Sequence, residues 1–233
     1  MKSLRLFAVA VLCVIGAGCL FGQDDPLSWV NAARHAARLP GVSADTLLSD
    51  TAARWAARLA GSGILTHHGD DGSTALDRYR AMGGTDVRVG EILGAGPRAG
   101  LIEKAWMASP EHRSVALWPG WTHAGWGAAP DGRSLVLVMM FTQRMVADLS
   151  ITQGADGLRV SGRFLSEHAQ AGFLYNGLDE VQPVEWDPAR GAFRFFVPAE
   201  AQEGYLRLGY QSAEGGFTLT NAWRGTTPSR PGR

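Results

Sequence analysis

The sequence contains two cysteines, Cys13 and Cys19, and none after position 19. The rest of the chain can form no disulfide, so we expect a hydrophobic core alone to hold the fold together. Lysine is also scarce, because only Lys2 and Lys104 occur among 22 basic residues. These 22 basic residues balance 22 acidic ones, giving a formal net charge of +0. This balance excludes a generally basic nucleic-acid-binding protein, so we expect no nucleic-acid partner.

Long hydrophobic runs are absent too. The longest, over residues 6–15, is shorter than the roughly 20 residues that a membrane-spanning helix needs. It follows Lys2 and Arg5 and precedes three small residues at 16–18, which is the pattern of a secretory signal peptide. We therefore expect residues 1–22 to be a signal peptide and the mature protein to be exported.

The position of Cys19 leaves two alternatives open. The small residues directly before Cys19 resemble a bacterial lipoprotein processing site, with cleavage before the cysteine and a lipid attached to it. Two acyl chains or more would anchor the protein stably, and this is the membrane contact that we expect. Otherwise the segment is an ordinary cleavage site that contains a cysteine. With ordinary cleavage the protein would be extracellular or periplasmic. With a lipid at Cys19 it would be anchored to a membrane.

Residues 26–146 combine helical patterns with one hairpin. Apolar spacing and end signals predict helices over 26 to about 40, 45–60, 74–82, 98–108 and 110–117. Strands are expected at 124–128 and 135–141, joined by a turn at Pro130-Asp131-Gly132-Arg133. The second strand is apolar on both faces, which predicts a central strand covered on both sides.

Residues 148–224 have a different pattern. Short apolar runs recur every 8–12 residues between Gly, Asp and Pro, and no helical stripe occurs. This is typical of a small antiparallel sandwich or barrel. We expect an α+β chain with two domains, at 26–146 and 148–224, and a disordered tail at 225–233.

Several polar clusters in the first domain could carry chemistry, but each also has a structural interpretation. A single His commonly pairs with a backbone carbonyl, and Gly69-Asp70-Asp71-Gly72 reads as a turn that lacks the oxygen ligands of a calcium loop. The tryptophans favour a core role, and Asp77-Arg78 suits a structural ion pair or a helix cap.

Taken together, the order of these clusters resembles the CAP superfamily of cysteine-rich secretory, antigen 5 and pathogenesis-related 1 proteins, most closely its bacterial branch without disulfides. The resemblance covers about residues 27–146. The segments that carry it are Trp55-Ala56, Thr66-His67, Asp71-Gly72-Ser73, Asp77-Arg78, Gly90-Glu91, Trp106, Ser109-Pro110, His112-Arg113, Thr122 with Gly125-x-Gly127, and Phe141-Thr142-Gln143.

This resemblance implies an α-β-α sandwich with a shallow groove that holds two His and usually two acidic residues. By position these are His67, His112 and Glu91. The second acid is missing: Ser109 stands near its place, and Glu111 is the nearest carboxylate. Ile92 also replaces the Asn that usually follows the groove Glu.

His67, Glu91 and His112 are predicted to converge. Two imidazoles and a carboxylate would suit zinc with one open position, where a bound water could be activated. Without metal, these groups could exchange protons near neutral pH or bind a ligand through hydrogen bonds.

Three functions follow from these observations. The first, which we favour, is a binding module at the cell envelope or outside the cell; the resemblance implies lipid or sterol, cell-wall or protein partners. The second is a metal-assisted, peptidase-like hydrolase that uses the His67, Glu91 and His112 site. The third is a stable envelope domain whose groove has no activity.

Overall fold

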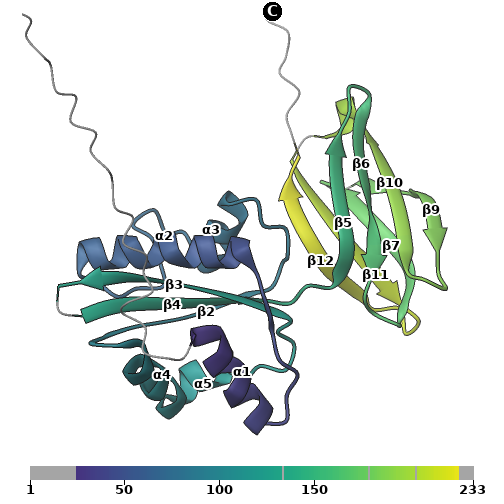
Figure 1. Ribbon diagram of the computed structural model, residues 1–233. Helices are drawn as coiled ribbons and strands as arrows, with labels where there is room; N and C mark the ends of the chain where they lie inside the picture. The colour runs from purple at the N-terminus through teal and green to yellow at the C-terminus, as the bar shows by residue number, and fades with distance from the viewer. Residues whose placement is uncertain (1–24, 133, 178, 203, 226–233) are drawn as a thin grey trace, which may run out of the picture.

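The computed structural model describes residues 25–132, 134–177, 179–202 and 204–225, which form an α-β-α unit followed by a β unit (Figure 1). The expected signal peptide, Cys19, and the expected tail apart from Gly225 lie outside these residues. The expected α+β class is confirmed. None of the described helices is both long and apolar enough to cross a membrane.

The first unit is built on a four-stranded sheet in the order β1-β3-β4-β2. Its strands are β1 (Ser43–Ala44), β2 (Val89–Gly96), β3 (His123–Asp131) and β4 (Ser134–Thr142). Helices α2 (Thr46–Ser62) and α3 (Ala75–Ala81) lie on one face (Figure 1). The opposite face carries α1 (Pro26–Ala36), α4 (Ala99–Ala108) and α5 (Pro110–Ala116), so the expected sandwich is confirmed.

Strand β4 is the buried central strand that its apolar sequence predicts. Successive side chains of a strand point to opposite faces of the sheet. Leu137 and Met139 pack into the core beneath α1, α4 and α5, whereas Val138 and Met140 pack into the core beneath α2 and α3. All four side chains are completely buried. One strand therefore contributes to both hydrophobic cores.

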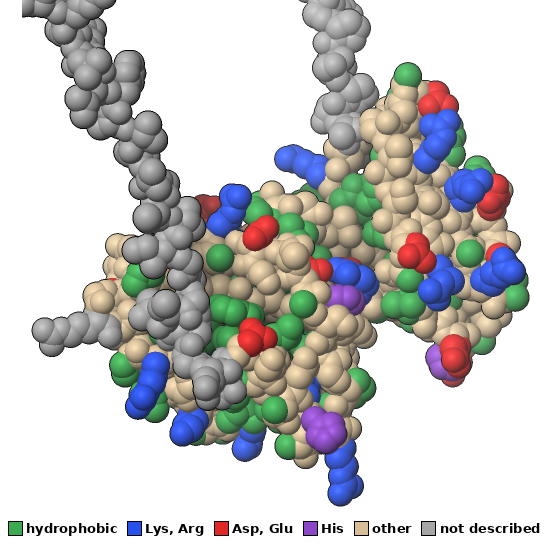
Figure 2. Space-filling model, viewed as in Figure 1, with side chains coloured by type: hydrophobic (Ala, Val, Ile, Leu, Met, Phe, Trp, Pro, Cys, Tyr) green, Lys and Arg blue, Asp and Glu red, His purple; other side chains and the backbone are tan. Residues whose placement is uncertain are grey.

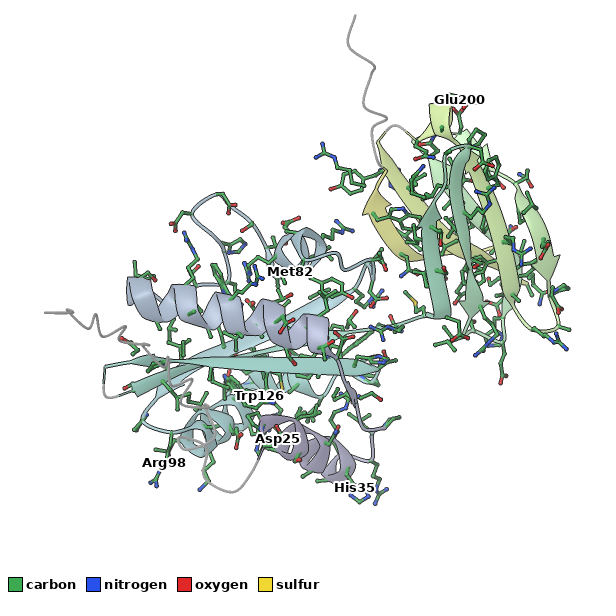
Figure 3. All side chains as sticks on the ribbon, turned by 45° about the horizontal axis from the view of Figure 1, so that its top comes forward. Asp25, His35, Met82, Arg98, Trp126 and Glu200 are labelled. Carbon is green, nitrogen blue, oxygen red and sulfur yellow. The ribbon has the colours of Figure 1, made fainter. Side chains whose placement is uncertain are left out.

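Capping side chains mark the starts of α1 and α3. Asp25 accepts a hydrogen bond from Ser28 N at the start of α1, and its second carboxylate oxygen accepts one from Trp126 Nε1 at 2.8 Å (both labelled in Figure 3). Asp77 and Thr74 form a reciprocal capping box at α3, which confirms the helix-cap interpretation of Asp77.

Three boundaries differ from the sequence-based expectation. Helix α1 ends at Ala36 rather than near residue 40, and α2 runs past Gly61 to a left-handed cap at Gly63, φ 68°. Strands β3 and β4 extend so far that Pro130 pairs with Leu135. Strand β2 was not predicted, because its glycines break the period of apolar residues on which strand prediction relies.

The Gly125-x-Gly127 motif lets α2 lie directly on the backbone of β3. A Cβ atom added at Gly125 would lie 2.3 Å from Ser49 N, and one at Gly127 would lie 2.2 Å from the Cα of Ala53. Both distances are too short for any side chain, and the atoms approached belong to the helix backbone. The separation of helix and sheet therefore depends on these two glycines.

We expect Gly127→Ala to lower the free energy of unfolding by about 3 kcal/mol or more, because a rigid backbone cannot move aside for a methyl group. Urea titration followed by tryptophan fluorescence measures the effect. The matched control is Gly61→Ala, where the space is open. Its effect should lie between zero and a gain of about 1 kcal/mol from helix propensity. Equal effects of the two substitutions would contradict the close approach.

Arg34 is a fully buried cation whose role the sequence did not reveal. Its guanidinium donates to four carbonyl oxygens, those of Pro40, Ala116, Trp118 and Trp121, at 2.9–3.4 Å. Burial lowers the pKa of Arg34. This side chain ties α1 to the end of α5, where carbonyl groups at a helix C-terminus favour a cation.

The β unit is a sandwich of two four-stranded sheets. One sheet has the order β5-β6-β10-β9 and the other β12-β11-β7-β8 (Figure 1). Buried side chains of both sheets share a single core, including Val160, Phe195, Leu174 and Leu206. The bounds are β5 (Val146–Gln153), β6 (Gly157–Phe164), β7 (Ala169–Asn176), β8 (Asp179–Val181), β9 (Pro183–Asp187), β10 (Ala192–Pro198), β11 (Tyr205–Ser212) and β12 (Phe217–Arg224), with a short 3-10 helix, η2 (Ala199–Ala201).

Backbone pairing joins the two units. The segment 85–87, between α3 and β2, lies beside β12: Ala222 N donates to Thr85 O at 2.8 Å, and Val87 N donates to Thr220 O at 3.3 Å. Strand β4 ends at Thr142 and strand β5 starts at the buried Val146. Only three residues, 143–145, therefore link the two units along the chain.

Asp86 is buried at this junction, 3% exposed. Its carboxylate accepts hydrogen bonds from Tyr79 Oη at 3.0 Å and Asn221 Nδ2 at 3.2 Å, and Arg144 Nε lies 3.7 Å away. Burial raises the pKa of Asp86 in spite of Arg144 and the hydrogen bond from Tyr79. Arg144 is shared with Asp45, the N-cap of α2, at 2.6 Å.

The raised pKa of Asp86 predicts a pH dependence of stability. The folded state holds the Asp86 proton more tightly than the unfolded state, so this carboxyl stabilises the fold below its usual pKa of 3.8. The contribution is lost as pH rises through the higher folded pKa. We expect wild type to lose stability relative to Asp86→Asn as pH rises from about 4, in urea titrations at several pH values. The exposed Asp50→Asn is the control, and a pH-independent difference for Asp86→Asn would contradict the prediction.

Candidate functional site

The candidate site centres on Glu91, which lies on β2 at the edge of the first sheet. The Glu91 side chain is only 3% exposed, yet both of its carboxylate oxygens are hydrogen-bonded. His67 Nδ1 lies 2.8 Å from Oε1, and Arg78 Nη2 lies 2.7 Å from Oε2. The structure therefore brings together two residues that the sequence singled out, His67 and Glu91, and adds Arg78.

Arg78, on α3, holds the site together. Its Nη1 donates to the carbonyl oxygens of His67 and Ser73, each at 3.1 Å, while Nη2 binds Glu91. The guanidinium also stacks on Trp55 of α2, 3.8 Å from the ring centroid, which is a favourable cation–π geometry. One side chain thus fixes the 67–73 loop against both β2 and α2.

His67 presents one side of its ring to solvent, since its side chain is 49% exposed. An ionised carboxylate can only accept hydrogen bonds, so the hydrogen of this pair belongs to Nδ1 of His67. In a neutral imidazole this tautomer leaves Nε2 as an acceptor. The pair can bind a donor group of a ligand, or move a proton at Nε2, without breaking its bond to Glu91.

The third predicted residue, His112, has different partners. Its Nδ1 lies 2.8 Å from Ser109 Oγ, the N-cap of α5. The structure records no hydrogen bond or ion pair between His112 and either His67 or Glu91 within the described residues. His112 instead lines a hollow of about 300 Å³ between β2 and α4, together with Trp106. The predicted contact between His67 and Glu91 is thus present. Among the described residues, no hydrogen bond or ion pair joins either of them to His112.

The zinc expectation does not fit this geometry. No group of three or more His, Cys, Asp or Glu side chains within the described residues could hold a metal ion. Each oxygen of Glu91 already accepts a hydrogen bond, and the Arg78 guanidinium supplies positive charge beside it. A second cation at this carboxylate would be repelled by the adjacent Arg78 guanidinium, 2.7 Å from Glu91.

Ser109 does not have the geometry of an activated nucleophile. Its hydroxyl donates to Glu111 Oε2 at 2.9 Å, and its oxygen faces His112 Nδ1. The pKa of Glu111 is lowered, first by its own backbone N–H and then by the Ser109 hydroxyl. A solvent-exposed carboxylate with a lowered pKa is a weak base. These contacts suit helix capping rather than catalysis.

The loop 69–73 is a turn, as its sequence suggests. Gly69 N donates to Ser73 O, and Gly72 N to Gly69 O, both at 2.9 Å. This turn, α2 and α3 enclose a hollow of about 420 Å³ beside the Arg78–Trp55 stack, which Met82 also lines (labelled in Figure 3). Arg58 pairs with Asp70 here, but exposed pairs add little stability.

Figure 2 shows basic and acidic side chains interspersed over this view rather than gathered in one patch.

Trp55 is the site residue that the sequence did not assign. Its position in the apolar stripe of α2 correctly predicts burial, at 4% exposure. No sequence signal shows that the same ring supports Arg78, because that contact joins residues 23 positions apart on two helices.

Removal of the Glu91 charge should destabilise the fold strongly. We expect Glu91→Gln to lower the free energy of unfolding by about 3 kcal/mol, because it leaves the largely buried Arg78 without its anion. The partly exposed His67→Gln should cost under about 1 kcal/mol. Urea titration measures both changes, with the exposed Glu111→Gln as control. A double-mutant cycle of Glu91→Gln with Arg78→Gln measures the coupling energy between the two side chains. If the losses in the free energy of unfolding of the two single variants simply add, the network is contradicted.

Comparison with known proteins places these features in a family. The sequence model of the cysteine-rich secretory protein (CAP) family matches residues 27–143, about half of the chain. A search of curated protein sequences finds no match.

Solved structures with a similar fold include an outer surface protein of Borrelia burgdorferi, with 22% identity over 51% of this chain and 89% of that one and a TM-score of 0.48. A second is an extracellular SCP-domain protein of Bacillus anthracis, with 22% identity over 49% of this chain and 38% of that one and a TM-score of 0.46. A third is venom allergen-like protein 4 of Schistosoma mansoni, with 14% identity over 50% and 82% of the two chains and a TM-score of 0.39.

The family match spans the whole α-β-α unit, including the Gly125-x-Gly127 strand, the Arg78–Glu91 pair and the capped helices. This chain therefore belongs to the CAP, or cysteine-rich secretory protein, family.

Proposed function

We propose that this protein is an exported CAP-domain binding module rather than an enzyme. The observation that carries the proposal is that both oxygens of the buried Glu91 are bonded to protein groups, one of them a guanidinium. A carboxylate held in this way is neither a free metal ligand nor a free general base. The Arg78–Glu91–His67 network instead holds a loop rigidly, and rigid loops suit recognition because little entropy is lost on binding.

The sequence and the surface beside the network support this proposal. A basic n-region, an apolar run and small residues at the N-terminus favour export, with a lipid at Cys19 or by ordinary cleavage. The hollow of about 420 Å³ is lined by the Trp55 ring, Met82 and the basic side chains of Arg54 and Arg58. Asp70 and Asp71 line it as well, so the hollow combines apolar groups with charges of both signs. This mixture suits a lipid, sterol, cell-wall or protein partner that has an apolar part and a polar part.

The competing hydrolase requires a metal, so zinc binding is the test. We expect calorimetric titration of the mature protein with zinc chloride to show no micromolar site that depends on His67 or His112. The physical reason is that Arg78 already neutralises Glu91 and that no group of three metal ligands occurs among the described residues. His67→Ala and His112→Ala are measured alongside wild type, and His168→Ala, an exposed His of the β unit, controls for surface binding.

The outcomes separate the two functions. Weak binding that is unchanged in all three variants agrees with the binding module. A micromolar or tighter site that is lost in both His67→Ala and His112→Ala, but kept in His168→Ala, would overturn the proposal in favour of the metal-assisted hydrolase. Thermal unfolding of each variant shows that the protein remains folded.

A further inference from the structure

A second hollow lies where the two units meet, between the end of α3 and the paired strands β11 and β12. It has a volume of about 400 Å³. Figure 1 shows the chain after α3 running beside β12 at this point. The lining residues that matter are Arg80, Gly83, Gly84, Tyr205, Trp223 and Arg224.

The hollow is a built feature of the junction. The pairing of residues 85–87 with β12 holds its two sides together through backbone hydrogen bonds. Gly83 has a φ of 95°, and the place where a side chain would stand is open. At Gly84 a Cβ atom would lie 2.3 Å from the ring of Tyr79. The wall formed by α3 therefore ends in two residues without side chains: the space at Gly83 is open, and the space at Gly84 is taken by the Tyr79 ring.

The charge of this hollow has one sign. Arg80 and Arg224 line it, and no Asp or Glu does so among the described residues. The structure records no ion pair within 4 Å for either arginine in the part of the chain that it describes. The carboxylate of Asp77, which acts on Arg80 electrostatically, is bonded to Thr74 in the capping box. The two arginines are thus available to an anion.

Two buried donors in the lining also have no hydrogen-bond partner among the described residues: Arg80 Nε and Trp223 Nε1. A buried N–H group without a partner is costly and rare in a folded protein. Both atoms are shielded from solvent, so the ligand contacts come from the guanidinium groups of Arg80 and Arg224 that line the hollow. An arginine binds a carboxylate best, because its planar donors match the two carboxylate oxygens.

Aromatic rings supply the other half of the recognition. Tyr205 is 46% exposed, and the guanidinium of Arg80 lies 6.0 Å from the centre of its ring. Trp223, on β12, is partly buried. The face of a pyranose ring carries C–H groups that pack on aromatic rings, whereas its hydroxyls and carboxylate accept hydrogen bonds from N–H donors.

We propose that this junction hollow binds a carboxylated sugar ring, such as a uronic acid unit of an acidic polysaccharide. Arg80 and Arg224 bind the carboxylate, and Tyr205 and Trp223 pack on the ring. A volume of about 400 Å³ accommodates one or two sugar units and lies within the usual range of ligand sites. The site involves none of His67, Glu91 and His112, so it extends the proposed function to a second surface and stands independently of the zinc experiment.

The test is calorimetric titration of the folded protein with digalacturonic acid, with uncharged digalactose as the matched neutral probe. We expect saturable binding of the acid and at least tenfold weaker binding of the neutral sugar, because the charge-assisted hydrogen bonds are lost. Arg80→Gln and Arg224→Gln should each weaken binding of the acid about tenfold, and Tyr205→Ala likewise. The controls are Arg113→Gln, an exposed arginine of α5, and Phe217→Ala, an exposed aromatic residue of β12.

Separate probes distinguish the chemistry. Sodium benzoate and inorganic phosphate are titrated as an aromatic carboxylate and as a simple anion, and both should bind much more weakly than digalacturonic acid. Equal binding of benzoate or phosphate would overturn the assignment to a sugar. Equal binding of digalactose, no binding of digalacturonic acid, or unchanged binding in the folded Arg80→Gln/Arg224→Gln double variant would overturn the site. Circular dichroism and thermal unfolding confirm that each variant is folded; should Arg80→Gln unfold, Arg224→Gln alone decides.

Discussion

The direct contact of α2 with the backbone of β3 is the constraint on which the rest of the first unit depends. Without side chains at Gly125 and Gly127, the helix lies close to the sheet. This distance sets the depth of the core between them and the position of Trp55, whose ring supports Arg78. Arg78 in turn positions Glu91 and the loop that carries His67. The two glycines therefore determine the site although neither touches it.

The site shows how the fold accommodates a buried carboxylate. A buried carboxylate needs a compensating positive charge. Here that charge comes from a guanidinium that also binds two carbonyls and stacks on a tryptophan, so Arg78 serves structure and charge balance together. His67 completes the shell from the solvent side. The network fixes the 67–73 loop against β2 and α2.

Local signals in the sequence were sufficient for much of this structure. The Asp25-Pro26 start of α1, the turn near Gly132 and the apolar run of β4 depend on neighbouring residues, and so they could be predicted. The order of short motifs also singled out His67, Glu91 and His112, of which only His67 and Glu91 are bonded to each other among the described residues. The contacts of Arg34 and Trp55 could not be predicted, because they join segments far apart in the sequence. Likewise, nothing near residues 85–87 indicates that they pair with β12.

That pairing has a consequence for how the chain folds. Thr85 and Asn221 are 136 positions apart, and they meet only through hydrogen bonds at the junction. During synthesis the first unit can be complete well before β12 leaves the ribosome, because domains generally fold as units from the N-terminus. A contact of such high sequence separation also closes late for entropic reasons. Until β12 pairs with residues 85–87, Asp86 is exposed to water and no backbone pairing holds the two units together.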